Sequence, residues 1–150
     1  MYKKVLVPLD GSKLSESVLN HVVAIATGCQ VPEVVLLRVR EPLDASVKAV
    51  LDPEIAEQLD QAYHDESAKY LNRISKKLEK KGAATRVEVL SGNPADEIIK
   101  YSKDNHIDLI IMSTHGRSGF SRIVFGSVAD KVIRQAEKPV LLKPAGKRNN

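Results

Sequence analysis

Short apolar runs alternate with longer, capped segments along the whole of this 150-residue sequence. Most of the runs are continuous stretches of valine, leucine and isoleucine, which are typical of strands that are buried on both faces of a parallel sheet. The run at 85–90 alternates in character instead, which predicts a strand at the edge of the sheet. The predicted strands span residues 4–8, 33–39, 85–90, 108–112 and 139–142.

The segments between these runs carry helix signals. Ser12 and Gly28 suit the two ends of one helix, and Ser127 suits the start of another that runs to residue 136. The pairs Asp52-Pro53 and Asn93-Pro94 join a capping side chain to a proline in the first turn. The longest helix, 52–82, has one apolar stripe that we expect to run its full length, through Ile55, Leu59, Ala62, Leu71, Ile74 and Leu78. Residues 40–51 are expected to be a polar connection.

This alternation predicts an α/β fold of three layers, a parallel sheet with helices on both faces. A length of 150 residues fits one domain, and 43% hydrophobic residues suffice for its core. We expect the domain to span residues 1–144 and residues 145–150 to form a polar tail. The pattern leaves the strand order open.

A net charge of +4 raises the possibility of a nucleic-acid-binding protein. Aromatic residues make up only 4% of the chain and form no stacking platform, so we expect no nucleic-acid role. No apolar run approaches the length of a membrane span, and we expect no membrane association. The N-terminus lacks the pattern of a signal peptide, and the single cysteine, Cys29, excludes an internal disulfide. These features predict a cytoplasmic protein.

A stretch rich in glycine and hydroxyl groups follows the fourth predicted strand and runs from Ser113 to the helix at Ser127. Glycines let backbone amides approach a ligand closely, and a helix start offers unpaired donors to an anion. The local pattern leaves two interpretations open: a phosphate-binding loop, or a flexible loop with an ordinary helix cap.

This stretch resembles the nucleotide loop of the universal stress protein family, whose ATP-binding members carry Gly-x-x-Gly, nine residues, and Gly-Ser or Gly-Thr. Here Gly116 is the second glycine, residues 117–125 are the nine, and Gly126-Ser127 close the motif. Ser113 stands where the family has its first glycine. The resemblance extends from residue 4 to residue 142.

The resemblance implies strand order 3-2-1-4-5 and an ATP site, or an ADP or AMP site, at the crevice between strands one and four. Magnesium would be held mainly by the phosphates. For Asp10 a turn residue bonded to its own backbone is the alternative, and for Val39 it is a strand residue in the core. With the loop residues that could contact phosphate, the predicted site comprises Pro8, Asp10, Val39, Ser113, His115, Gly116, Arg117, Gly119, Gly126, Ser127 and Val128.

The resemblance also implies a homodimer formed through the fifth strand, at Val140, Leu141 and Leu142. We predict no catalytic residue and no metal held by protein side chains. The expected function is therefore that of a regulatory protein with ATP as effector, whose bound state a partner protein reads. Two alternatives stay open: a nucleotide-independent dimeric interaction module, which the Ser113 departure favours, and a nucleotide-processing enzyme.

Overall fold

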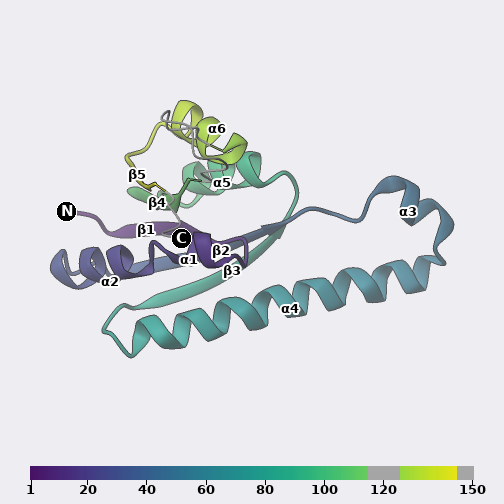
Figure 1. The fold of residues 1–150 in the computed structure, drawn as a ribbon, viewed down its shortest axis with the longest axis horizontal. Coiled ribbons are helices and arrows are strands. Elements are labelled where there is room, and N and C mark those ends of the chain that lie inside the picture. Colours follow the sequence, from purple (N-terminus) through teal and green to yellow (C-terminus); the bar gives the residue numbers. More distant parts are fainter. Residues whose placement is uncertain (115–125, 145–150) are drawn as a thin grey trace, which may run out of the picture.

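A five-stranded parallel sheet in the order β3-β2-β1-β4-β5 forms the centre of the protein, with helices on both faces (Figure 1). The computed structural model describes residues 1–114 and 126–144. The predicted α/β class and the strand order are both confirmed, and β3 lies at an edge as its alternating pattern indicated.

The helices and strands follow one another in the predicted alternation, with two additional helices. In chain order they are β1 (Lys4–Pro8), α1 (Lys13–Glu16), α2 (Leu19–Gly28), β2 (Glu33–Arg40), α3 (Ala45–Val50), α4 (Pro53–Glu79), β3 (Thr85–Ser91), α5 (Pro94–Asp104), β4 (Leu109–Ser113), α6 (Ser127–Gln135) and β5 (Val140–Lys143). Within the described part of the chain, none of the helices has both the length and the apolar character needed to cross a bilayer.

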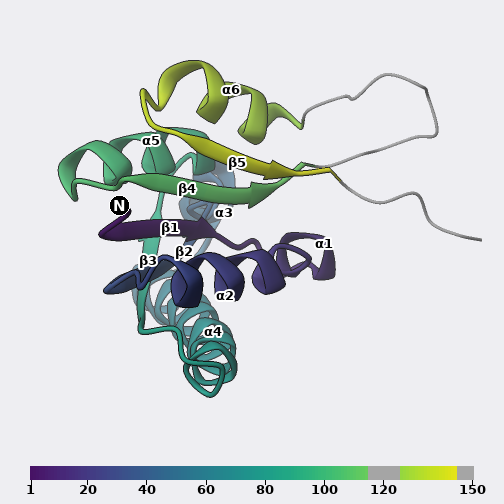
Figure 2. The same cartoon turned by 90° about the vertical axis from the view of Figure 1, so that its left-hand side faces the viewer.

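The sheet separates two apolar cores. Figure 2 shows α2 and α4 on one face of the sheet and α5 and α6 on the other. Val5 and Val7 of β1 point into the core beneath α2 and α4, whereas Leu6 points into the core beneath α5 and α6. All three side chains are at most 1% exposed, because a strand with helices on both faces buries successive residues on opposite sides.

Three of the predicted helix starts carry the expected cap. The Ser12 hydroxyl accepts a hydrogen bond from the Ser15 amide at 3.1 Å. The Asp52 carboxylate accepts from the Glu54 amide at 2.9 Å, and the Asn93 side chain accepts from the Asp96 amide at 3.2 Å. Short polar side chains at these positions satisfy amides that have no partner within the helix.

The single helix predicted over 12–28 is wrong, because the chain breaks it into α1 and α2 at Ser17 and Val18. The Ser17 amide bonds the Leu14 carbonyl at 3.1 Å, three residues back, which tightens the last turn of α1. The Lys143 ammonium of β5 donates to the Ser17 carbonyl at 2.9 Å. In a continuous helix the Ser17 carbonyl would accept a hydrogen bond from the amide four residues later. Here it accepts from Lys143, which is 126 residues away in the sequence.

The polar connection predicted over 40–51 is also wrong in part, since it contains α3. Asp44 caps α3 by accepting from the Ser46 amide at 2.8 Å. Figure 1 shows α3 and the N-terminal half of α4 extending beyond the sheet. We call this projection, residues 41–66, the arm.

The apolar stripe of α4 does not continue along the whole helix as predicted. Leu71 and Ile74 are fully buried against the sheet, whereas Ile55 is 54% exposed. Leu71 comes sixteen residues after Ile55, which at about 100° per residue places the two side chains about 160° apart around the helix. The N-terminal stripe therefore faces away from the core.

Candidate functional site

A cavity of about 370 Å³ opens at the carboxyl ends of β1, β2 and β4. From β1 the chain continues into α1 beneath the sheet, whereas β4 is followed by α6 above it (Figure 2). The connections that follow β1 and β4 lead to opposite faces of the sheet, which creates the crevice where ligands bind in open α/β sheets. Seven of the predicted site residues line the cavity, namely Pro8, Asp10, Val39, Ser113, Gly126, Ser127 and Val128.

The remaining predicted loop residues, His115, Gly116, Arg117 and Gly119, lie outside the described residues. The structure therefore brings together every predicted site residue that it describes. Their role in binding stays a prediction.

The turn after β1 forms one wall of the cavity. Asp10 Oδ1 accepts a hydrogen bond from the Ser12 amide at 2.8 Å, and the Asp10 amide donates to the Ser15 hydroxyl at 3.4 Å. Asp10 is thus the turn residue bonded to its own backbone that we considered as an alternative. Gly11 has φ of +88°, a conformation that favours glycine. The turn therefore fixes the Asp10 carboxylate at the cavity wall.

The N-terminus of α6 forms the opposite wall. Gly126 is the N-cap residue, and no side chain of residues 1–114 or 126–144 caps the helix. Ser127 is the first helical residue rather than the cap, so of its two predicted roles only the hydroxyl donor is left. The amides of the first turn precede the first intrahelical bond, from the Asp130 amide to the Gly126 carbonyl at 2.9 Å. This wall therefore presents backbone donors and the positive end of the helix dipole.

Val39 and Ser113 close the cavity from the sheet. Val39 lines the cavity and packs on the core beneath α5, so the alternative of a core residue holds alongside its predicted position. Ser113, the last residue of β4, is 7% exposed and pairs in register with Lys143 of β5. Its small side chain leaves the sheet intact at the position of the missing motif glycine.

Sequence reasoning missed the other half of the lining. Topology could have indicated some of these residues: Pro94 starts the helix that follows β3, and Ser15 lies one turn after the Ser12 cap, so both stand beyond the carboxyl end of a parallel strand. The other additional lining residues are apolar, and nothing in the sequence around them indicates that they line a cavity. The additional lining residues are Leu9, Ser15, Leu37, Pro94, Ile98, Met112 and Ala129.

Strand order, helix placement and a cavity at the switch point define a doubly wound, Rossmann-like α/β protein. A model of the universal stress protein family matches residues 1–144, and the chain belongs to this family. It is 32% identical to universal stress protein MJ0577 of Methanocaldococcus jannaschii over 95% of this chain and 94% of that protein. The solved MJ0577 structure superposes with a TM-score of 0.82 at 35% identity, covering 98% and 99% of the two chains.

Two more distant solved structures share the fold. A universal stress protein in complex with cAMP has a TM-score of 0.69 at 20% identity, covering 97% of this chain and 98% of that one. A universal stress protein family protein of Arabidopsis thaliana with AMP bound has a TM-score of 0.66 at 18% identity, covering 98% and 94%.

Proposed function

We propose that this chain binds ATP in the cavity at the carboxyl ends of β1, β2 and β4. The observation that carries the proposal is the convergence of seven predicted residues, from three strands and one helix start, on that single cavity. Two members of the same fold have cAMP and AMP bound, which supports an adenine nucleotide as the ligand class.

The residues suit different parts of the nucleotide. The N-terminus of α6, at Gly126 and Ser127, offers amides and a hydroxyl to the phosphates. Pro8 and Asp10 would lie along the adenosine, and the Val39 backbone next to the adenine. ADP and AMP fit the same arrangement with fewer phosphates. Magnesium would neutralise phosphate charge, held by the phosphate oxygens.

We further propose that the protein is a dimeric, cytoplasmic regulator rather than an enzyme. Bound ATP would stabilise one state of the cavity walls, and a partner protein would read that state. β5 is the last strand of the described sheet on its side, and Val140, Leu141 and Leu142 are each half-buried there. Pairing of two such edges, antiparallel across a two-fold axis, would continue the sheet between protomers.

Calorimetric titration of nucleotide-stripped protein with ATP and magnesium tests the proposal, with Gly126→Val as the variant. The backbone at Gly126, φ −61° and ψ 156°, accepts any residue, so the substitution adds bulk at the phosphate end without straining the chain. We expect micromolar binding by the wild type and at least a tenfold loss in the variant. Gly28→Val is the matched control, because a Cβ at Gly28 meets no atom within 4 Å.

Absence of heat and of a thermal shift in the wild type would contradict ATP binding and favour the nucleotide-independent interaction module. Rapid ATP turnover by the wild type would instead favour the nucleotide-processing enzyme. Equal binding by wild type and Gly126→Val would place the nucleotide elsewhere.

A further inference from the structure

Acidic and basic residues are separated along α4 and the segment that leads into it: the acidic residues come first and the basic residues follow. The arm, residues 41–66, contains eight carboxylates and one lysine. Residues 69–81 contain six lysines and arginines and one glutamate. Acidic residues near a helix start and basic residues near its end suit the helix dipole, but that effect falls off within the first and last turn. The division extends over the 27 residues of α4, about 40 Å, so the dipole does not account for it.

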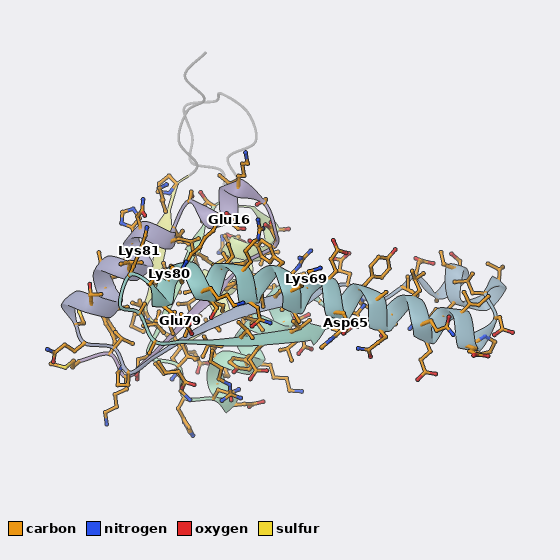
Figure 3. All side chains as sticks on the ribbon, turned by 90° about the horizontal axis from the view of Figure 1, so that it is seen from below. Glu16, Asp65, Lys69, Glu79, Lys80 and Lys81 are labelled. Atoms are coloured by element: carbon orange, nitrogen blue, oxygen red, sulfur yellow. The ribbon has the colours of Figure 1, made fainter. Side chains whose placement is uncertain are left out.

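The basic end borders a wide groove of about 1030 Å³ between α4 and the turn after β1. Figure 3 shows Lys69 and Lys80 on the half of α4 that lies over the sheet. Among the described residues, the groove cations lie within 4.0 Å of no carboxylate, whereas Lys4, Arg40 and Lys131 each have such a partner. The cations that line the groove are Arg38, Lys69, Arg73, Lys76, Lys77 and Lys80.

Tyr70 gives this groove a defined floor. Two guanidinium groups lie over its ring, with Arg38 at 5.2 Å and Arg73 at 5.5 Å from the ring centroid. Its hydroxyl donates to Glu16 of α1 at 3.1 Å. Stacking holds the two arginines in place, so part of the ordering cost of an acidic ligand is already met.

The arm carries the complementary features. Ile55 is 54% exposed, Val50 82% and Tyr63 44%, and Ile55 faces away from the core stripe of its own helix. The same arm carries eight carboxylates, of which Asp60 is paired with Arg40. Exposed apolar side chains on an acidic segment match a groove lined by six cationic side chains, whose aliphatic stems can cover apolar surface, and, among the described residues, by only two carboxylates, Asp10 and Glu66.

We propose that α4 mediates pairing with a second copy of this chain, in which the acidic arm of each copy packs antiparallel against the basic groove of the other. The contact is isologous, so each copy contributes both an arm and a groove. Because the N-terminal half of α4 is acidic and its C-terminal half is basic, antiparallel pairing about a two-fold axis near residue 67 sets the acidic half of each α4 against the basic half of the other. This interface is separate from the β5 edge.

The register follows from the axis position. Pairs whose residue numbers sum to about 134 oppose one another, so Glu54 meets Lys80 of the second copy and Glu66 meets its Lys69. Ile55 then lies against the lysine stems at the end of the partner's helix, where its exposed surface is covered.

Reciprocal charge reversal tests this pairing by sedimentation equilibrium of the full chain. Lys69→Glu/Lys80→Glu reverses the charge at two positions of the basic end, and Glu54→Lys/Glu66→Lys reverses it at the two acidic positions that oppose them. At about 0.01 M salt we expect wild-type protein to have twice the mass of either variant alone, because each variant opposes like charges at the 54/80 and 66/69 pairs, which occur twice in the symmetric contact. An equimolar mixture of the two variants regains the doubled mass, since both reversed contacts are then complementary.

Control measurements distinguish a loss of α4 pairing from a loss of folding and from pairing through β5. Lys3→Glu/Lys100→Glu carries the same change in charge away from α4 and keeps the wild-type mass. Circular dichroism verifies that each variant is folded. If β5 also pairs two chains, each β5 dimer carries two α4 faces, so wild-type protein has at least twice the mass of either variant and the difference stays readable. Raising salt to about 0.5 M shortens the screening length to about 4 Å and halves the wild-type mass.

Equal masses for the wild type and both variants at low salt would overturn the proposal, as would a mixture that fails to regain the doubled mass. A wild type that does not pair through α4 but binds inorganic polyphosphate, with loss of binding in Lys69→Glu/Lys80→Glu, would also overturn it and assign the groove to a polyanion.

Discussion

The two halves of α4 belong to one helix and have opposite surroundings. From Ser67 onward the helix packs on β2 and β3, and Leu71, Ile74 and Leu78 are at most 2% exposed. In the arm the same helix has Ile55 54% exposed. Both halves contain apolar residues at helical spacing, so hydrophobic periodicity identifies a helix but does not tell which stripe a sheet will cover. Substitutions in the two halves test whether their burial differs as described and where along α4 the change occurs.

The largest expected difference is between Leu71→Ala and Ile55→Ala. Leu71 is fully buried, so its truncation removes transfer free energy and leaves a cavity, at a cost of about 2–5 kcal/mol in the free energy of unfolding. Ile55→Ala should change that free energy by about 0.5 kcal/mol or less, because the side chain is largely exposed. Urea unfolding at high salt, where α4 pairing is weakened, measures both. Equal losses of unfolding free energy in the two variants would mean that Ile55 is buried and that the arm packs against the rest of the domain.

The root of the arm is held by the ion pair between Arg40 and Asp60, at 2.8 Å. The Arg40 side chain is only 12% exposed, so Asp60→Asn leaves a largely buried cation with a weaker partner. We expect a loss of about 1–2 kcal/mol in urea unfolding, the cost of weakening a hydrogen bond to a charged group.

Asp65→Asn is the matched comparison, since the Asp65 carboxylate is 68% exposed and, among the described residues, pairs only with Gln61 and His64 of its own helix. Its expected change is about 0.5 kcal/mol or less. If Asp60→Asn were as mild as Asp65→Asn, the ion pair would not anchor the arm, and the boundary between the halves would lie nearer to Ser67.

The smallest expected effect concerns Tyr70, at the boundary itself. Burial, and then the charge and hydrogen bond of Glu16, raise the pKa of Tyr70 from 10.0 to about 12. A raised pKa favours the protonated phenol in the folded state, so its stabilisation is present below pH 10 and is lost as pH rises toward 12. Tyr70→Phe removes the hydroxyl and should cost about 1 kcal/mol at pH 8.

Urea midpoints of wild type and Tyr70→Phe at pH 8 and pH 11 measure this effect. The difference between them should shrink at pH 11, because only the wild type loses the tyrosine contribution. Parallel behaviour at the two pH values would show that Tyr70 titrates in the folded protein as it does in the unfolded chain.

The residues that sequence reasoning placed correctly are those with strong local chemistry. Asp52 and Asn93 cap helices because their side chains reach amides two or three residues ahead, which requires nothing from the rest of the chain. The strands follow from continuous apolar runs. The strand order did not follow from the pattern and came only from the family resemblance, because crossover handedness restricts order without determining it.

The errors lie where distant residues decide the outcome. Lys143 bonds the Ser17 carbonyl at the break between α1 and α2, and no local signal reveals a partner 126 residues away. The uncovered stripe at Ile55 depends on where the sheet ends. The cavity was predicted through its motif residues, whereas its apolar lining, such as Leu37 and Met112, is a by-product of packing.

The stacked position of Tyr70 has an optical consequence. The chain has no tryptophan and four tyrosines, so tyrosine dominates its near-ultraviolet absorbance at wavelengths beyond the phenylalanine band, and its fluorescence excited there. Tyr70 lines the basic groove, and two guanidinium groups lie over its ring. The wild-type protein therefore carries a native chromophore at the surface proposed to receive the partner's arm, and the wild-type minus Tyr70→Phe difference spectrum isolates the signal of that surface without a dye.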